Sequence, residues 1–222
     1  MIIAIDGPAG SGKSTVARRV AERLGFRYLD TGAMYRAIAV RALEAGIDPE
    51  DEDAVSSLAR SEKIVFKHEG QTTFATRVEV GGRDVTTAIR SPVADATVSA
   101  VARLPRVREA MVSQQRAIGQ ARDIVVEGRD IGSVVFPDAE VKVFLTASPD
   151  ERARRRAAEQ VARGHEVEHE AVADAIAKRD QTDSTRQTSP LIAAPGAVQL
   201  DTTGLGIEEV VDRVVELARE RM

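Results

Sequence analysis

The strongest constraint on the fold of this chain is a glycine-rich motif near its N-terminal end. Residues 7–14 read Gly-Pro-Ala-Gly-Ser-Gly-Lys-Ser, a full match to the pattern G-x-x-x-x-G-K-[ST]. The motif directly follows the apolar run 1–5 and opens a helical pattern. A strand, a loop and a helix in this order surround a polyphosphate with backbone N–H groups and the positive end of a helix. The motif therefore predicts an α/β fold that binds a nucleoside triphosphate.

The residues of this motif have separate expected roles. Lys13 is expected to reach the β- and γ-phosphates of ATP, and Ser14 to hold Mg²⁺ through the nucleotide. The expected ATP-binding set is Gly7, Pro8, Ala9, Gly10, Ser11, Gly12, Lys13, Ser14 and Thr15. The alternative, a glycine-rich turn with a chance lysine, is disfavoured by the strand and the helix on either side.

Composition excludes several classes of protein. The chain has 222 residues, a formal net charge of −4 and no cysteine. The charge gives no indication of a nucleic-acid or membrane binder, and the missing cysteine excludes disulfides and thiol catalysis. No apolar run approaches the roughly 20 residues that span a bilayer. No basic segment precedes the first strand, so no signal peptide is visible, and we expect a cytoplasmic protein.

Apolar strands alternate with helical patterns along most of the chain. This alternation predicts a doubly wound α/β fold with a five-stranded parallel sheet. The expected strands are 1–5, 27–30, 124–127, 141–145 and 197–200. The expected helices are 16–24, 31–45 with Thr31 as its N-cap, 54–60, 87–102, 106–120, 149–163, 169–182 and 207–219. Residues 63–86 interrupt the alternation with short strands at 63–67, 72–80 and 83–85, which predict a small antiparallel β insert.

Four polar clusters fall at expected strand ends or on helices. They are 30–36, Ser99 with Arg106 and Arg108, 127–132, and 178–186. Open α/β sheets bind ligands at their strand ends. The clusters contain several arginines and few carboxylates, which suits an anionic phosphate acceptor. Taken singly, the first cluster is also typical of a capped helix, the second of a helix surface and the fourth of a salt-bridge ladder. The charged triplet after the strand at 124–127 is poor core material and favours a site.

Other charged and motif-like segments leave alternatives open. The arginine run 152 and 154–156 is expected either to close over the γ-phosphate as a lid or to form a solvated helix face. Residues 165–169 match the zinc-protease pattern H-E-x-x-H, but the stretch is hydrophilic and shows no third ligand. Residues 201–204 imitate the D-x-x-G of a GTPase switch without a guanine motif. A GTPase, or a kinase for another small acceptor such as shikimate or dephospho-coenzyme A, remains the alternative function.

At these residues the chain resembles the bacterial cytidylate kinases. The resemblance is carried by the glycine-rich motif and by 29–36, 104–108, 127–139, 178–180 and 189–191. The insert resembles the one that separates the bacterial enzymes from the shorter eukaryotic UMP/CMP kinases. The resemblance implies a monomeric enzyme that uses ATP and Mg²⁺ to convert CMP or dCMP to CDP or dCDP, without binding nucleic acid or membrane. It divides the chain into a core (1–30, 121–151 and 171–222), a monophosphate-binding region (31–120) and a helical lid (152–170).

The resemblance also implies roles for single residues. Ser99, Arg108 and Asp130 would read the cytosine edge, and Arg179 and Asp183 would hold the ribose. Thr31, Arg36, Arg129 and Arg186 would bind the CMP phosphate, with Tyr35 also in the CMP site. The catalytic set would be Lys13, Arg129, Arg186, Arg152 and Arg155. Relatives often carry Ser where this chain has Thr31, and the hydroxyl survives that exchange.

Overall fold

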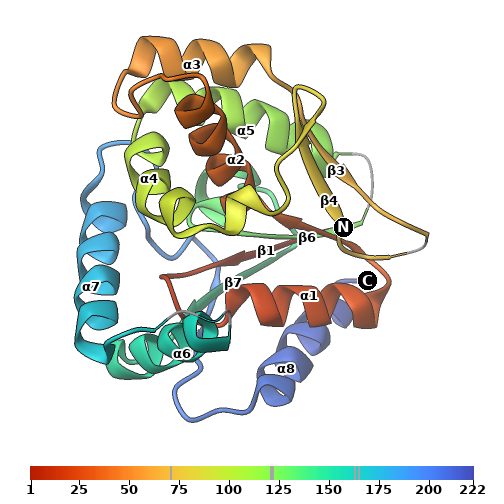
Figure 1. Cartoon of the computed structure of the whole chain (residues 1–222). Coiled ribbons are helices and arrows are strands. Elements are labelled where there is room, and N and C mark those ends of the chain that lie inside the picture. The colour runs from red at the N-terminus through yellow and green to blue at the C-terminus, as the bar shows by residue number, and fades with distance from the viewer. Residues whose placement is uncertain (71, 121–122, 163, 165) are drawn as a thin grey trace.

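A five-stranded parallel sheet forms the centre of the molecule (Figure 1). The computed structural model describes residues 1–70, 72–120, 123–162, 164 and 166–222. The strands are β1 (Ile2–Asp6), β2 (Arg27–Asp30), β6 (Ile124–Gly128), β7 (Val141–Thr146) and β8 (Val198–Asp201), and their order in the sheet is β2-β6-β1-β7-β8. The predicted fold class is confirmed.

The register of the strands brings their carboxyl ends to one edge of the sheet. Asp30 at the end of β2 lies opposite Glu127 of β6. Asp6 at the end of β1 lies opposite Gly128 of β6. Three carboxylate-bearing positions therefore share one edge, which is also where the glycine-rich motif begins.

Helices cover both faces of the sheet. They are α1 (Lys13–Leu24), α2 (Thr31–Glu44), α3 (Glu52–Ser61), α4 (Pro92–Ala102), α5 (Pro105–Gly119), α6 (Pro149–Ala162), α7 (His169–Thr185) and α8 (Ile207–Arg219). Alternate strand residues enter two apolar clusters: Ile3 and Ile5 pack with α1 and α8, whereas Ala4 and Val126 pack with α2, α4 and α5. Figure 1 shows α1 and α8 below the sheet and α2 to α5 above it.

The cap of α2 and the segment before α4 differ from the prediction. Asp30, not Thr31, caps α2, because its carboxylate accepts a hydrogen bond from the Ala33 N–H at 2.9 Å. The single helix expected over 87–102 is a 3-10 turn (Ala88–Arg90) followed by α4. Ser91 caps α4 and Pro92 occupies its first turn, which separates the two pieces.

The small β insert is confirmed, with one strand shorter than predicted. Strands β3 (Ile64–Lys67), β4 (Arg77–Val80) and β5 (Arg83–Asp84) form an antiparallel sheet in that order. The first part of the expected strand 72–80 instead lies against the edge strand β2. The Tyr28 N–H donates to the Thr73 carbonyl at 2.9 Å, and Arg27 donates to the Thr72 carbonyl at 2.6 Å. Residue 71, between the expected strands 63–67 and 72–80, lies outside the described residues.

Candidate active site

The glycine-rich loop between β1 and α1 has a backbone that only glycine can adopt. Gly7 has a φ of 148°, and a Cβ there would lie 2.1 Å from the carbonyl oxygen of Leu145. Gly10 has a φ of 74°, and a Cβ there would lie 2.7 Å from the Arg152 carbonyl oxygen. The loop is therefore held tightly between β7 and α6. It contains Gly7, Pro8, Ala9, Gly10, Ser11 and Gly12, and α1 continues it through Lys13, Ser14 and Thr15.

Lys13 folds back onto this loop. Its Nζ donates to the Pro8 carbonyl at 2.6 Å and to Ser11 Oγ at 3.4 Å, and the side chain is buried. Burial, together with the nearby Arg129 and Arg179 guanidinium groups, holds the pKa of Lys13 well below its usual value. The amine therefore lies inside the phosphate loop and would gain stability from an anion placed there.

Ser14 and Glu127 bring two kinds of oxygen together beside the loop. The Ser14 hydroxyl donates to Glu127 Oε2 at 2.9 Å, and the Tyr28 hydroxyl donates to Glu127 Oε1. Burial and the neighbouring Asp30 raise the pKa of Glu127. A hydroxyl and a carboxylate next to a phosphate loop are the hard oxygen donors that suit Mg²⁺. Sequence reasoning placed Glu127 in a polar cluster without a role of its own; its place at the end of a buried strand was the available signal.

Asp6 was missed altogether by sequence reasoning. Its two carboxylate oxygens accept hydrogen bonds from the Ile131 and Gly132 N–H groups, both at 2.8 Å. These bonds hold a π-helical turn (Ile131–Val135) that directly follows Asp130. Burial raises the pKa of Asp6 to about 6, although the two backbone hydrogen bonds oppose this shift. The available signal was a carboxylate between the first apolar run and Gly7.

A buried ion pair joins α5 to the end of β6. Arg108 contacts Asp130 through Nη2, and both side chains are buried. The Arg108 guanidinium also lies 5.4 Å from the centre of the Tyr35 ring. The helix-surface alternative is therefore wrong for Arg108, whereas it holds for Arg106, which pairs with Asp53 at the surface at 2.5 Å.

A second charged group joins α7 to the residue after β6. Arg129 Nε donates to Asp183 Oδ2 at 2.9 Å, and Arg186 Nη1 lies 3.5 Å from Asp183 Oδ1. Burial would raise the pKa of Asp183, but Arg129 and Arg179 outweigh it and hold that pKa below its usual value. Burial and Arg129 lower the pKa of Arg179 to about 10. The polar cluster 178–186 is therefore not only a salt-bridge ladder along α7, because its Asp183 carboxylate pairs with Arg129, the residue that follows β6.

Thr31 and Arg36 of the first cluster, 30–36, already have partners within the protein. Thr31 Oγ1 donates to the Glu127 carbonyl at 2.7 Å, and Arg36 Nη2 donates to Asp30 Oδ2 at 2.8 Å. Ser99 lies half-buried on α4. Thr31 and Arg36 are thus both close to the carboxyl edge of the sheet, each with a partner inside the protein.

Several buried polar atoms near the Arg108–Asp130 pair lack a hydrogen-bond partner among the described residues. They are Tyr35 Oη, Arg108 Nε, both amide atoms of Gln115 and Arg186 Nη2. Such atoms usually find partners in water or in a ligand. Sequence reasoning missed Gln115, which occupies a core-facing position of α5 four residues after the buried Met111. The available sequence signal was a polar residue at a position of the helix where the spacing predicts an apolar one.

Two arginines of the 152–156 run contact the phosphate loop. Arg152 Nη1 donates to the Ala9 carbonyl at 3.2 Å and also pairs with Asp180. Arg155 Nη1 lies 3.5 Å from the Ser11 carbonyl, and Arg155 Nη2 donates to the Thr202 carbonyl at 2.8 Å. The run is therefore not simply a solvated face of α6.

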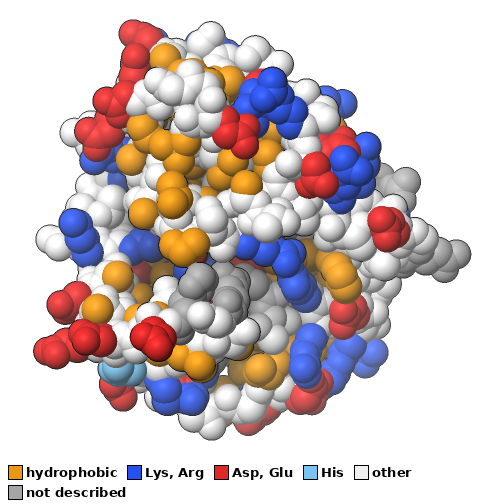
Figure 2. Space-filling model, in the orientation of Figure 1, with side chains coloured by type: hydrophobic (Ala, Val, Ile, Leu, Met, Phe, Trp, Pro, Cys, Tyr) orange, Lys and Arg blue, Asp and Glu red, His pale blue; other side chains and the backbone are white. Residues whose placement is uncertain are grey.

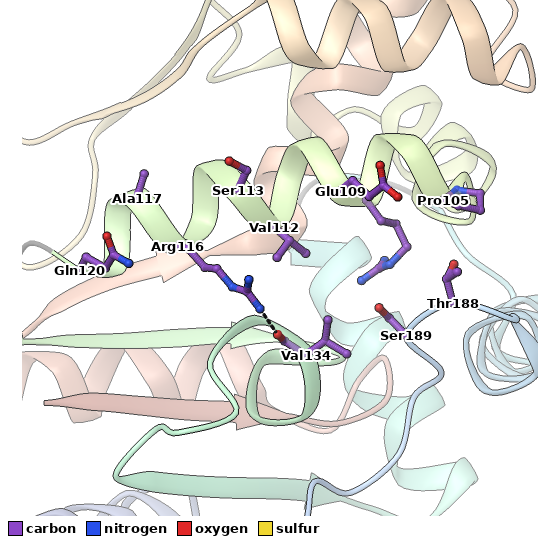
Figure 3. Close-up of a pocket in the computed structure, with 11 residues that line it drawn as sticks. Pro105, Glu109, Val112, Ser113, Arg116, Ala117, Gln120, Val134, Thr188 and Ser189 are labelled. Carbon is purple, nitrogen blue, oxygen red and sulfur yellow. Dashed lines mark hydrogen bonds between the residues drawn. The ribbon is translucent and has the colours of Figure 1, made fainter.

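A groove of about 600 Å³ opens beside the Arg108 pair (Figure 3). Helix α5 lines one side of it, and Thr188 and Ser189 line the other, with Val134 at its base. Arg116 donates to the Val134 carbonyl at 2.7 Å across this base. Arg108 also lines the groove, so the groove leads from the surface to the buried Arg108–Asp130 pair.

Neither the zinc-protease pattern nor the GTPase-like pattern gains support from the described residues. Residue 165 of the H-E-x-x-H match lies outside them, and His169 begins α7. Within the described part of the chain, no group of three or more His, Cys, Asp or Glu side chains could hold a metal ion. Asp201 accepts the Thr203 N–H at 2.9 Å and thereby closes a turn after β8.

Comparison with known proteins shows the family of this chain. The cytidylate kinase family model matches residues 3–220. The chain belongs to the cytidylate kinase family. It is 52% identical to a cytidylate kinase of Geobacillus kaustophilus over 99% of this chain and 97% of the relative. It is 51% identical to a bifunctional pantoate ligase/cytidylate kinase of a Synechococcus strain over 100% of this chain and 44% of the relative.

Solved structures support the fold alone. A shikimate kinase from Bacteroides thetaiotaomicron aligns with a TM-score of 0.50 at 15% identity, covering 99% of this chain and 98% of that one. An uncharacterised protein from Eubacterium ventriosum aligns with a TM-score of 0.55 at 12% identity, covering 100% and 99%. Both alignments extend over essentially the whole chain.

Proposed function

We propose that this protein transfers the γ-phosphate of ATP to CMP or dCMP, giving CDP or dCDP and ADP. The observation that carries the proposal is the buried Arg108–Asp130 pair, which lies beside the Arg129–Asp183 pair at the same sheet edge as the phosphate loop. Membership of the cytidylate kinase family supports the same reaction. The buried Tyr35, Gln115 and Arg186 atoms that lack a hydrogen-bond partner among the described residues would supply further capacity for an acceptor nucleotide.

The loop residues would hold the donor. Lys13 would exchange the Pro8 carbonyl and Ser11 hydroxyl for the β- and γ-phosphates, and the Gly-rich backbone would cradle them. Ser14, supported by Glu127, would hold Mg²⁺ on the nucleotide side of the site. The metal, when bound, would neutralise charge on the phosphates.

The charged groups at the end of β6 would hold the acceptor. Cytosine presents an amino donor at N4, whereas its N3 and O2 accept hydrogen bonds. Asp130 can accept from N4, Arg108 can donate to the acceptors, and Ser99 would add a hydroxyl. Uracil has a carbonyl at position 4, which would face the Asp130 carboxylate unfavourably. This pairing therefore favours cytosine over uracil.

The remaining arginines would position the two phosphates. Thr31, Arg36, Arg129 and Arg186 would bind the CMP phosphate, while Arg179 and Asp183 would hold the ribose. The acceptor is an anionic phosphate at neutral pH, so transfer needs positioning and charge neutralisation more than a strong base. Arg152 and Arg155, already against the Ala9 and Ser11 carbonyls, are proposed to stabilise the transferred group as the 152–170 lid excludes water.

The wider setting of the enzyme is part of the same proposal. We propose a cytoplasmic monomer with a core (1–30, 121–151 and 171–222), a monophosphate-binding region (31–120) and the lid. None of the described helices is long and apolar enough to cross a bilayer. Acidic and basic side chains are intermixed over the face shown in Figure 2, whereas nucleic-acid binding typically uses a basic patch or stripe.

A coupled ADP-release assay tests the proposal. ATP and Mg²⁺ are offered with CMP, dCMP, UMP, AMP, GMP, shikimate or no acceptor. We expect fast turnover with CMP and dCMP, slower turnover with UMP and a negligible blank. Slow ATP hydrolysis at a rate independent of the acceptor would overturn the assignment of the acceptor site. Fast transfer to CMP, at the same rate with GTP as with ATP, would exclude the GTPase alternative.

A further inference from the structure

The hydroxyl of Tyr28, on the edge strand β2, donates to Glu127 beside the phosphate loop. We infer that Tyr28 is a positioning residue that fixes Glu127 for its support of Mg²⁺. The inference rests on the proposed kinase function, because it concerns the metal that accompanies the nucleotide. It adds a residue to which no role in the site has so far been given.

The two oxygens of Glu127 have separate partners. Oε2 accepts from the Ser14 hydroxyl at 2.9 Å, and Oε1 accepts from the Tyr28 hydroxyl. Glu127 is 4% exposed and Tyr28 is 6% exposed, so solvent does not readily replace either contact. Tyr28 therefore fixes the rotation of the carboxylate, and Ser14 lies at its other oxygen.

The two contacts would respond differently to a bound nucleotide. If the Ser14 hydroxyl turned to hold a metal ion, Glu127 Oε2 would become available to support that ion. The Tyr28 contact lies on the other oxygen and need not change. Residues that orient the groups around a metal ligand typically tune metal affinity about 10–100-fold, and Tyr28 would act in this way through Glu127.

Tyr28 is itself held by the β insert. Its N–H donates to the Thr73 carbonyl at 2.9 Å. The Arg18 guanidinium lies 5.4 Å from the centre of the Tyr28 ring and 5.6 Å from that of Phe74. Arg18 is therefore shared by one ring from the core and one from the insert. The insert thus supports the donor end of the site, through the residue that orients Glu127.

The test uses Tyr28→Phe, which removes the hydroxyl and keeps the ring against Arg18. Calorimetry measures the affinity for the non-hydrolysable analogue AMP-PNP with excess Mg²⁺ and again with EDTA. The ratio of these affinities reports metal support and is insensitive to a uniform loss of stability. We expect the ratio to fall roughly ten-fold relative to wild type. The Mg²⁺ concentration that half-activates turnover should rise in parallel.

Tyr35→Phe is the matched control, since the chain contains only two tyrosines. Tyr35 faces Arg108 in the acceptor site, so this variant should leave the Mg²⁺ ratio unchanged. A Tyr28→Phe ratio equal to that of wild type, or an equal fall in both variants, would overturn the role of Tyr28. If the wild-type protein binds AMP-PNP equally tightly with Mg²⁺ and with EDTA, the assignment of Ser14 and Glu127 to the metal is wrong. Wild type that shows the Mg²⁺ ratio but no CMP-dependent turnover would instead overturn the acceptor part of the proposed function.

Discussion

At the scale of single residues, Lys13 already donates its hydrogen bonds to the loop that it serves. Lys13→Ala removes the charge that would reach the transferred phosphate. We expect CMP-dependent turnover to fall at least 100-fold, in keeping with the size of such electrostatic contributions. Circular dichroism should show an intact fold. Unchanged turnover would contradict the assignment of the phosphate loop.

Asp130 tests the recognition of the base. Asp130→Ala removes the carboxylate that would accept from the cytosine amino group and leaves Arg108 without its buried partner. We expect kcat/KM for CMP to fall by roughly 5- to 150-fold, the range of one good base contact. Affinity for ADP, measured by calorimetry, should change little. Equal losses of CMP use and ADP binding would argue against base reading.

Asp183 tests the contact with the sugar. It accepts a hydrogen bond from Arg129 and contacts Arg186, and it is one of the two residues proposed to hold the ribose. If it accepts a hydrogen bond from the 2′-hydroxyl, Asp183→Ala should lower kcat/KM for CMP more than for dCMP. Parallel assays with the two acceptors measure this difference. The same penalty on both would contradict the contact.

At the scale of elements, Asp6 ties the end of β1 to the π-helical turn 131–135. Its pKa is raised to about 6, above the value near 3.8 of an unfolded chain, so the folded protein binds this proton more tightly. The contribution of Asp6 to stability is therefore fully present below pH 3.8 and is lost as the pH rises through about 6. The loss is on the order of 3 kcal/mol.

Carboxyl-selective NMR measures this titration directly. We expect one buried aspartate to titrate near pH 6 and the amides of Ile131 and Gly132 to shift with it. Asp6→Asn should abolish that titration. A wild-type spectrum in which every aspartate titrates below pH 4.5 would contradict the prediction.

The elements also show what the sequence could predict. Apolar runs and the glycine-rich motif were sufficient for the five parallel strands, because buried strands need continuous apolar residues. Residues 72–76 were mistaken for strand. Thr72 and Thr73 accept hydrogen bonds from the edge strand β2, whereas Thr76 donates to Lys67 of the insert. In the site, motif positions were predictable. The roles of Asp6 and Glu127 depend on strand register, and that of Gln115 on helix packing, which spacing alone does not reveal.

At the scale of the whole molecule, substrate binding should stabilise the fold by mass action. CMP at 100 times its Kd contributes about 2.7 kcal/mol. For a chain of this length, this corresponds to a Tm increase of roughly 5–10 °C. Differential scanning fluorimetry measures the shift, with GMP at the same concentration as the control. Equal shifts with CMP and GMP would contradict a cytosine-selective site.

Three arginines of the site are already paired with the protein's own acids: Arg36 with Asp30, Arg108 with Asp130, and Arg129 with Asp183. A nucleotide that binds these three arginines therefore exchanges one partner for another. The favourable part of each exchange is small, because one ion pair replaces another. We expect such a site to bind its nucleotides less tightly and to release its product quickly. As CDP leaves, each arginine has a carboxylate at hand, so the empty site returns to its starting arrangement.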